Sequence, residues 1–121
     1  MRDHTKLRAF EFADKLVLEV YPATRRFPRD EQFGLSSQLR RAALSIASNI
    51  VEGCARNSKA DYLRFIDMAY GSARETQYQL SVAFRLGYLD EPQYNTLQQL
   101  SEQTSKLLGA LAKALRQQPV E

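Results

Sequence analysis

The sequence predicts an all-α fold, a single antiparallel up-down-up-down four-helix bundle over residues 1–121. Apolar residues recur at spacings of three and four in four long segments, about 5–25, 35–56, 59–86 and 91–116. The four prolines, at positions 22, 28, 92 and 119, lie at or near the proposed helix ends. No segment alternates apolar and polar residues as a half-buried strand would.

Residue types typical of helix ends support these segments. Thr5 is placed to cap the first, and Pro22 should kink or terminate its last turn. The connection over 26–34 should be partly helical, because Asp30 and Glu31 suit a first turn. The end signals of the last two segments are Ser58 with Asp61, Gly87, and Asp90 with Gln93.

The second segment, 35–56, is apolar over more than half its circumference. One sector of its helical wheel is centred on Ile46 and predicts a core stripe, made with Leu35, Leu39, Ala42, Ala43, Ile50 and Gly53. A second apolar sector lies more than about 100° away. Its members are Leu44, Ala47, Val51 and Ala55. This sector needs a partner of its own, either a further helix or another subunit, and we assign it to an oligomer interface.

Positive charge is concentrated in one stretch. The formal net charge is +3, and residues 25–41 hold five arginines against two acidic residues. Such a patch fits a phosphate-bearing partner, although a solvated face with ordinary arginines has the same composition. The candidate nucleic-acid contacts are Arg25, Arg26, Arg29, Arg40, Arg41 and Arg56.

The sequence carries no motif for catalysis, for a metal or for a cofactor. The single histidine, His4, and the single cysteine, Cys54, lack the partners that a zinc site or a nucleophile would need. Glu52 and Glu75 stand beside small residues, and with Asn49 they are predicted to join arginines in a polar network rather than to act as an acid/base pair. We therefore expect no enzymatic activity.

Location follows from composition. No stretch approaches 18 uninterrupted apolar residues, so no membrane span is predicted. The N-terminal residues lack the apolar core of a signal peptide, and one cysteine cannot form an internal disulfide. These features predict a cytoplasmic protein.

Two stretches, SQLRRAALSIASNIVEGCAR and SKADYLRFIDMAYGSARETQYQL, resemble the bacterial four-helix-bundle family named for proteins encoded in intervening sequences of large-subunit rRNA genes. The most specific pieces are Arg40-Arg41, Ser48-Asn49-Ile50, Glu52-Gly53, Arg56, Tyr62, Phe65, and Gly71-Ser72 followed by Glu75. The bundle is also similar to the accessory variability determinant of diversity-generating retroelements. Ala47 departs from the family pattern, which often has proline there and a kink with it.

The resemblance implies a bundle that assembles into a ring, typically a homopentamer. It also implies a basic surface that, in the retroelement relative, engages nucleic acid and a reverse transcriptase, and it implies no enzymatic activity. The leading prediction is thus an oligomeric module that binds RNA or an RNA–DNA hybrid through arginines. The alternative is a structural or protein-interaction bundle whose arginines serve subunit interfaces.

Overall fold

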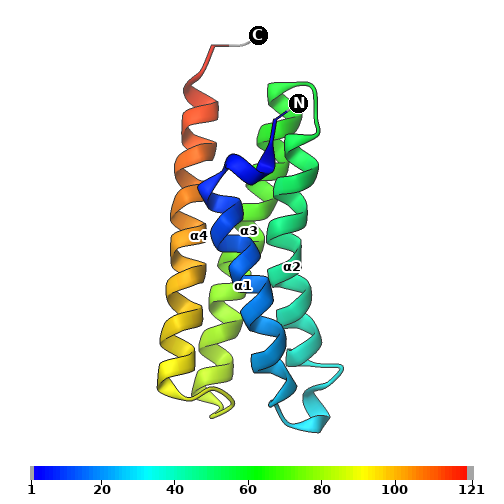
Figure 1. The fold of residues 1–121 in the computed structure, drawn as a ribbon, viewed down its shortest axis with the longest axis vertical. Coiled ribbons are helices and arrows are strands. Elements are labelled where there is room, and N and C mark those ends of the chain that lie inside the picture. Colours follow the sequence, from blue (N-terminus) through cyan, green and yellow to red (C-terminus); the bar gives the residue numbers. More distant parts are fainter. Residues whose placement is uncertain (1, 120–121) are drawn as a thin grey trace.

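The computed structural model describes residues 2–119 and contains there four α-helices, two short 3-10 turns and no strand (Figure 1). The helices are α1 (Arg8–Arg25), α2 (Leu35–Cys54), α3 (Lys59–Arg85) and α4 (Glu91–Gln117). The turns are η1 (His4–Lys6) and η2 (Arg29–Glu31). Each predicted segment therefore contains one helix, which confirms the all-α class, and η2 confirms that the first connection is partly helical.

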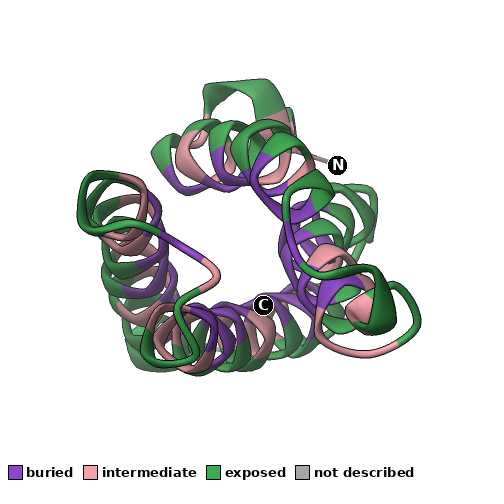
Figure 2. Cartoon of the chain, turned by 90° about the horizontal axis from the view of Figure 1, so that it is seen from below, coloured by how far each residue is buried: buried purple, intermediate pink, exposed green. Residues whose placement is uncertain are grey.

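The four helices surround one core. α1 packs beside α2 and α4, and α3 packs beside the same two helices. In the end-on view the buried residues of all four helices face inward (Figure 2). The core stripe predicted around Ile46 is buried, except that Leu35 is half-buried at the start of α2. Leu16 of α1 is fully buried as well.

The start of α1 differs from the prediction. Thr5 lies in η1, where the Asp3 carboxylate accepts hydrogen bonds from the Thr5 amide (3.0 Å) and hydroxyl (2.6 Å). Thr5 is therefore the capped residue and not the cap, and α1 begins three residues later, at Arg8. Leu7 precedes it and makes no side-chain cap.

Pro22 does not end α1, which continues to Arg25. A proline in a helix removes one backbone donor, the one that would pair with the carbonyl four residues earlier. In the same turn the Thr24 hydroxyl donates to the carbonyl oxygens of Val20 (2.9 Å) and Tyr21 (3.0 Å). These bonds run to the carbonyls four and three residues before Thr24, on the N-terminal side of the proline.

The connection between α1 and α2 is held in place by Glu31. One of its carboxylate oxygens accepts from the amide of Leu35 (3.0 Å), the first residue of α2, and the other accepts from the hydroxyl of Tyr88 (2.9 Å). These two donors, the Leu35 amide first, lower the pKa of Glu31, and the same carboxylate raises the pKa of Tyr88. The connection is thus attached both to α2 and to the turn between α3 and α4.

Candidate nucleic-acid interface

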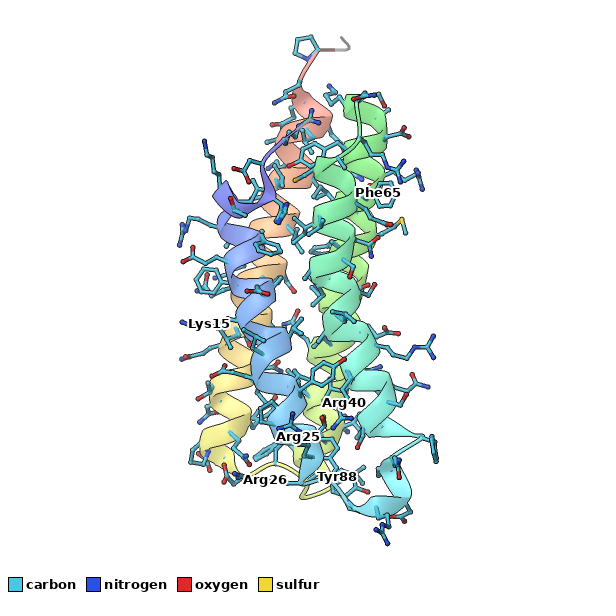
Figure 3. All side chains as sticks on the ribbon, turned by 45° about the vertical axis from the view of Figure 1, so that its right-hand side comes forward. Lys15, Arg25, Arg26, Arg40, Phe65 and Tyr88 are labelled. Atoms are coloured by element: carbon cyan, nitrogen blue, oxygen red, sulfur yellow. The ribbon has the colours of Figure 1, made fainter. Side chains whose placement is uncertain are left out.

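The six predicted arginines lie at two ends of the bundle. Figure 3 shows Arg25, Arg26 and Arg40 near Tyr88 at one end and Phe65 toward the other. Arg56 follows α2 at that far end, and a rise of 1.5 Å per residue separates it from Arg41 by roughly 20 Å along the axis. We call residues 25–41 the loop end. We call Arg2, Arg56, Tyr62, Arg64 and Phe65 the far end.

The loop-end arginines form no ion pair with any residue in the described part of the chain. Arg25, Arg26, Arg29 and Arg41 are exposed, and Arg40 is half-buried. Over residues 2–119 the ion pairs are Arg64 with Asp61 and Arg116 with Asp67, and neither includes a loop-end arginine. Glu31, one of the two acids in this stretch, is occupied by the Leu35 amide and the Tyr88 hydroxyl. The loop end therefore carries a net positive charge, five arginines against two acids, and none of these arginines is in an ion pair with a described residue.

Arg40 is held by the neighbouring helix. Its Nε donates to the Thr24 hydroxyl oxygen at 2.7 Å, and its guanidinium carbon lies 5.1 Å from the centre of the Tyr21 ring. Both partners belong to the last turns of α1, Tyr21 just before Pro22 and Thr24 just after it. The side chain is positioned before any ligand arrives, which lowers the entropic cost of a contact through its other nitrogens.

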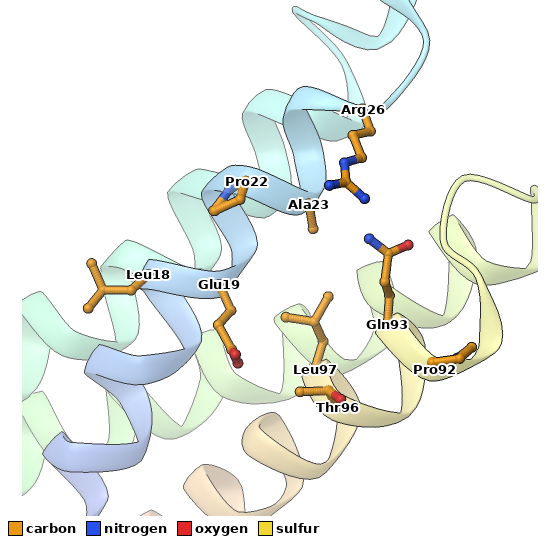
Figure 4. A pocket seen from close by; sticks show the side chains of 9 residues that line it. All are labelled: Leu18, Glu19, Pro22, Ala23, Arg26, Pro92, Gln93, Thr96 and Leu97. Atoms are coloured by element: carbon orange, nitrogen blue, oxygen red, sulfur yellow. The ribbon is translucent and has the colours of Figure 1, made fainter.

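Arg26 faces a different direction. A groove of about 460 Å³ lies between α1 and α4 and is lined by Leu18, Glu19, Pro22, Ala23, Arg26, Pro92, Gln93, Thr96 and Leu97. In Figure 4, Arg26 and Gln93 extend toward one another from opposite sides of this groove. The positive charge of the loop end is therefore spread around the end of the bundle, between the α1–α2 side and the α1–α4 side.

Phe33 is a feature of the loop end that the sequence analysis missed. Its side chain is 90% exposed, although it sits in the connection between two well-anchored elements. The sequence signal was available: an aromatic residue next to glycine in the basic connection RRFPRDEQFG is not placed by any helical stripe.

Arginines at the far end lie over aromatic rings. The guanidinium carbon of Arg2 lies 4.0 Å from the centre of the Tyr62 ring, and those of Arg56 and Arg64 lie 4.7 and 4.6 Å from that of Phe65. Both rings are buried. Arg56 is thus exposed but packed on the bundle, and it is too distant to act with the loop-end arginines on one patch.

The N-terminal residues close the far end. The Arg2 amide donates to the Cys54 carbonyl oxygen at 2.7 Å. The Cys54 side chain is buried beside Tyr62, and burial raises the pKa of its thiol. Burial likewise raises the pKa of Tyr62, to about 12, with a smaller contribution from Cys54. These groups stay neutral near pH 7 and pack as core residues, which fits the absence of a predicted role for Cys54.

Of the predicted polar network, only Asn49 makes side-chain hydrogen bonds in the described residues, and its partner is a serine rather than a carboxylate or an arginine. The Asn49 amide donates to the Ser45 carbonyl (2.8 Å) and hydroxyl (3.0 Å), and the Ser45 hydroxyl lies 2.9 Å from that of Ser72 on α3. Glu52 and Glu75 are exposed, and neither forms an ion pair within residues 2–119. Their pairing with arginines of another subunit stays a prediction.

A polar groove of about 380 Å³ runs beside this network. Gln38, Arg41, Ala42, Ser45 and Glu75 line it. It brings an arginine of α2 and a carboxylate of α3 to the same surface, with no ion pair between them in the chain. The groove therefore presents one positively and one negatively charged side chain.

The second apolar sector of α2 is only partly free. Leu44 and Val51 are 46% and 37% exposed, and Ala55 is exposed, whereas Ala47 is 8% exposed and belongs to the core cluster. Ala47 is therefore already packed within the chain. Met68 of α3 is 45% exposed and adds apolar surface on the neighbouring helix.

Within residues 2–119 no three acidic, histidine or cysteine side chains are grouped so that they could hold a metal ion. None of the helices described there is apolar enough over a sufficient length to cross a membrane.

The fold and the site define a small helical bundle with a basic end. The chain belongs to the family of 23S rRNA-intervening sequence proteins, whose sequence profile matches residues 5–110. It is similar to the crystal structure of a protein with unknown function from the S23 ribosomal protein family of Bacteroides thetaiotaomicron VPI-5482. That chain is 25% identical and superposes with a TM-score of 0.80, covering 87% of this chain and 95% of its own. No curated protein matches the sequence.

The family membership confirms the first resemblance drawn from the sequence. The similarity to the retroelement protein stays a prediction. The family's name and the neighbour's title describe no catalytic activity.

Proposed function

We propose that this chain is a non-enzymatic binding module that contacts RNA or an RNA–DNA hybrid through its loop end. The observation that carries the proposal is a group of arginines at one end of the bundle that no carboxylate of the described chain pairs with. Guanidinium groups match the geometry of phosphate oxygens, and a local excess of positive charge attracts a polyanion. The proposed phosphate contacts are Arg25, Arg26, Arg29, Arg40 and Arg41.

The proposed assembly is a homo-oligomeric ring of antiparallel up-down-up-down bundles, a pentamer as the family resemblance implies. The exposed Leu44 and Val51 on α2 and Met68 on α3 support a subunit contact along these two helices. Cyclic symmetry would place the loop ends on one circle, so the charge of each subunit would add to a common field. We propose a cytoplasmic location, where a protein partner such as a reverse transcriptase could share the bound nucleic acid.

The polar groove beside Ser45 favours a second candidate function. Arg41 and Glu75 line it without pairing, an arrangement that two subunits could complete by exchanging ion pairs. The chain would then be a structural or protein-interaction bundle whose arginines serve subunit interfaces. In that case Glu75→Gln lowers the assembly mass measured by light scattering. An unchanged mass with unchanged nucleic-acid binding favours the first function.

The proposed function is tested with the double variant Arg29→Ala/Arg41→Ala, which removes two exposed charges and spares the structural contacts of Arg40. Each phosphate contact contributes about 0.7 to the slope of log affinity against log salt on a single strand. We expect the slope to fall by roughly 1.4 and the affinity for a single-stranded RNA to fall roughly tenfold or more at 0.1 M salt. Fluorescence anisotropy titrations at several salt concentrations measure both quantities.

The matched control is Lys15→Ala/Lys106→Ala, which removes the same charge from exposed positions on α1 and α4 away from the loop end. It should leave the slope within about 0.5 of the parent's, because it removes no phosphate contact. Equal losses in both double variants would mean that only net charge matters. A parent that binds no RNA at 0.1 M salt would rule out the proposed function.

A further inference from the structure

Phe33 is the most exposed large apolar side chain in the described part of the protein. It is 90% exposed, whereas the next most exposed, Leu18 and Tyr78, are each 66% exposed. The same connection contains a second phenylalanine, Phe27, which is 6% exposed and lies 5.3 Å, ring to ring, from Tyr88. The connection can therefore bury an aromatic ring, and it buries one while presenting the other to solvent.

The segment that carries Phe33 is anchored on both sides. Before it, the Glu31 and Gln32 amides donate to the carbonyls of Pro28 (2.9 Å) and Arg29 (3.1 Å). After it, the Gly34 amide donates to the Glu31 carbonyl at 2.9 Å, and α2 begins one residue later. A Cβ atom at Gly34 would lie 2.7 Å from the Glu31 Oε1 that accepts from Leu35, so glycine leaves room for that cap. Phe33 is thus displayed by a turn with a fixed backbone.

The charges around Phe33 indicate what kind of partner suits it. Arg29 lies in the turn that precedes it, and Arg40 and Arg41 lie within roughly 10 Å of the start of α2 along the helix axis. The Glu31 carboxylate between them is occupied by the Leu35 amide and the Tyr88 hydroxyl. An exposed aromatic ring in a segment that also carries the exposed Arg29 and Arg41 suits a ligand that has both a flat apolar ring and a negative charge at each repeat. Unpaired nucleotides have both, because every base has a π-face and every nucleotide carries a phosphate.

We propose that Phe33 is a stacking platform for an unpaired base, so that the loop end recognises single-stranded RNA rather than a duplex. This inference rests on the proposed function and names its substrate class. The arginines supply contacts to phosphates in either form, whereas the ring contributes only when a base is free to leave its neighbours. Bases inside a duplex are already stacked on one another. Their flat faces are therefore not accessible to a protein side chain.

The experiment uses Phe33→Trp in the full chain, which contains no tryptophan of its own. An indole stacked on a base loses fluorescence, so titration with a 12-nucleotide oligouridylate should quench the emission in step with binding. A 12-base-pair RNA duplex should quench it little at equal occupancy, with occupancy followed by the anisotropy of a labelled strand. Leu18→Trp, at an exposed position on α1, is the matched reporter and should show little quenching with either ligand.

Affinities of two further variants complete the test. Phe33→Ala should weaken oligouridylate binding at least fivefold, by the usual cost of removing one stacking ring, with the salt slope unchanged because no charge is lost. Phe33→Leu keeps apolar bulk without a π-face and should bind nearly as weakly. Duplex affinity should stay within twofold for both variants. Leu18→Ala should bind both ligands as the parent does.

Each contrary result has a distinct meaning. If the parent binds oligouridylate but Phe33→Ala and Phe33→Leu bind it equally well, the stacking inference is wrong and the proposed function stands. If the parent binds neither RNA, both fail. If Phe33→Ala lowers the assembly mass in sedimentation, the Phe33 side chain contacts another protein subunit. This result too overturns the inference.

Discussion

The two ends of the bundle use the same residue types in different ways. At the far end, Arg2 lies over the buried ring of Tyr62, and Arg56 and Arg64 lie over that of Phe65. At the loop end, Arg29 and Arg41 are exposed without an ion pair in the described chain. Phe33 is exposed there as well.

A count of arginines and aromatic residues therefore does not locate a binding surface. Arginine and ring face each other at the far end, so the contact lies within the fold. At the loop end the structure leaves Arg29 and the Phe33 ring without such a contact, and a ligand could supply the partner for both. Variants should therefore separate the ends: far-end changes lower stability, and loop-end changes lower binding.

The largest expected effect is at the far end. Tyr62 is 3% exposed, and its ring packs between Cys54 and the Arg2 guanidinium. Tyr62→Ala leaves a cavity under the N-terminal residues and should lower the free energy of unfolding by about 3–5 kcal/mol. Urea unfolding at a fixed protein concentration measures the change, because any assembly makes stability depend on concentration.

The matched control for that change is Tyr62→Phe. It keeps the ring and removes only the hydroxyl, so we expect a loss below about 1.5 kcal/mol. Where both variants are folded, their RNA affinity should match the parent's. A loss of RNA binding in folded Tyr62→Phe would show that the far end takes part in recognition.

A smaller effect is expected at the anchor of the loop end, and it depends on pH. The pKa of Glu31 is lowered from 4.5 in the folded chain, chiefly by the Leu35 amide. A lowered pKa contributes stability that is present above the unfolded value and is lost as pH falls through the folded value. Glu31→Gln keeps an acceptor but no charge, so the parent should be more stable than the variant at pH 6–7 and lose that advantage below pH 4.5.

Urea unfolding of both proteins between pH 7 and pH 3 tests the anchor. Asp30→Asn is the matched control, because Asp30 is an exposed acid in the same turn for which the structure shows no side-chain hydrogen bond. It should be about as stable as the parent at pH 7, because no hydrogen bond is lost. If Glu31→Gln and the parent differ equally at all pH values, the carboxylate charge does not hold the loop end.

Most of the fold could be predicted from the sequence, because helical periodicity and end signals are local. The Ile46 stripe is buried and Asp90 forms a capping box with Gln93, as predicted. The start of α1 was placed too early, because Thr5 donates to the Asp3 carboxylate within η1 and the helix begins only at Arg8. Pro22 was expected to kink or terminate the last turn, yet α1 continues to Arg25.

The candidate site was harder to predict, because its composition depends on which groups meet in space. The sequence placed Arg56 with the loop-end arginines, yet α2 separates them by its length. It placed Glu52 and Glu75 in a network that Asn49 forms instead with serines. Phe33 falls on no periodic face and stands next to glycine, which was the one local sign that separated it from the buried Phe27.

We propose that the loop end binds nucleic acid, whereas the far-end contacts stabilise the fold. This proposal is tested most directly by measuring the affinity for one labelled single-stranded RNA with Arg29→Ala/Arg41→Ala and with Arg56→Ala/Arg64→Ala. Both double variants lose two positive charges. We predict that the loop-end variant binds roughly tenfold or more weakly at 0.1 M salt and the far-end variant within about twofold of the parent. Equal losses of affinity in the two variants would show that the loop end is not a separate binding surface.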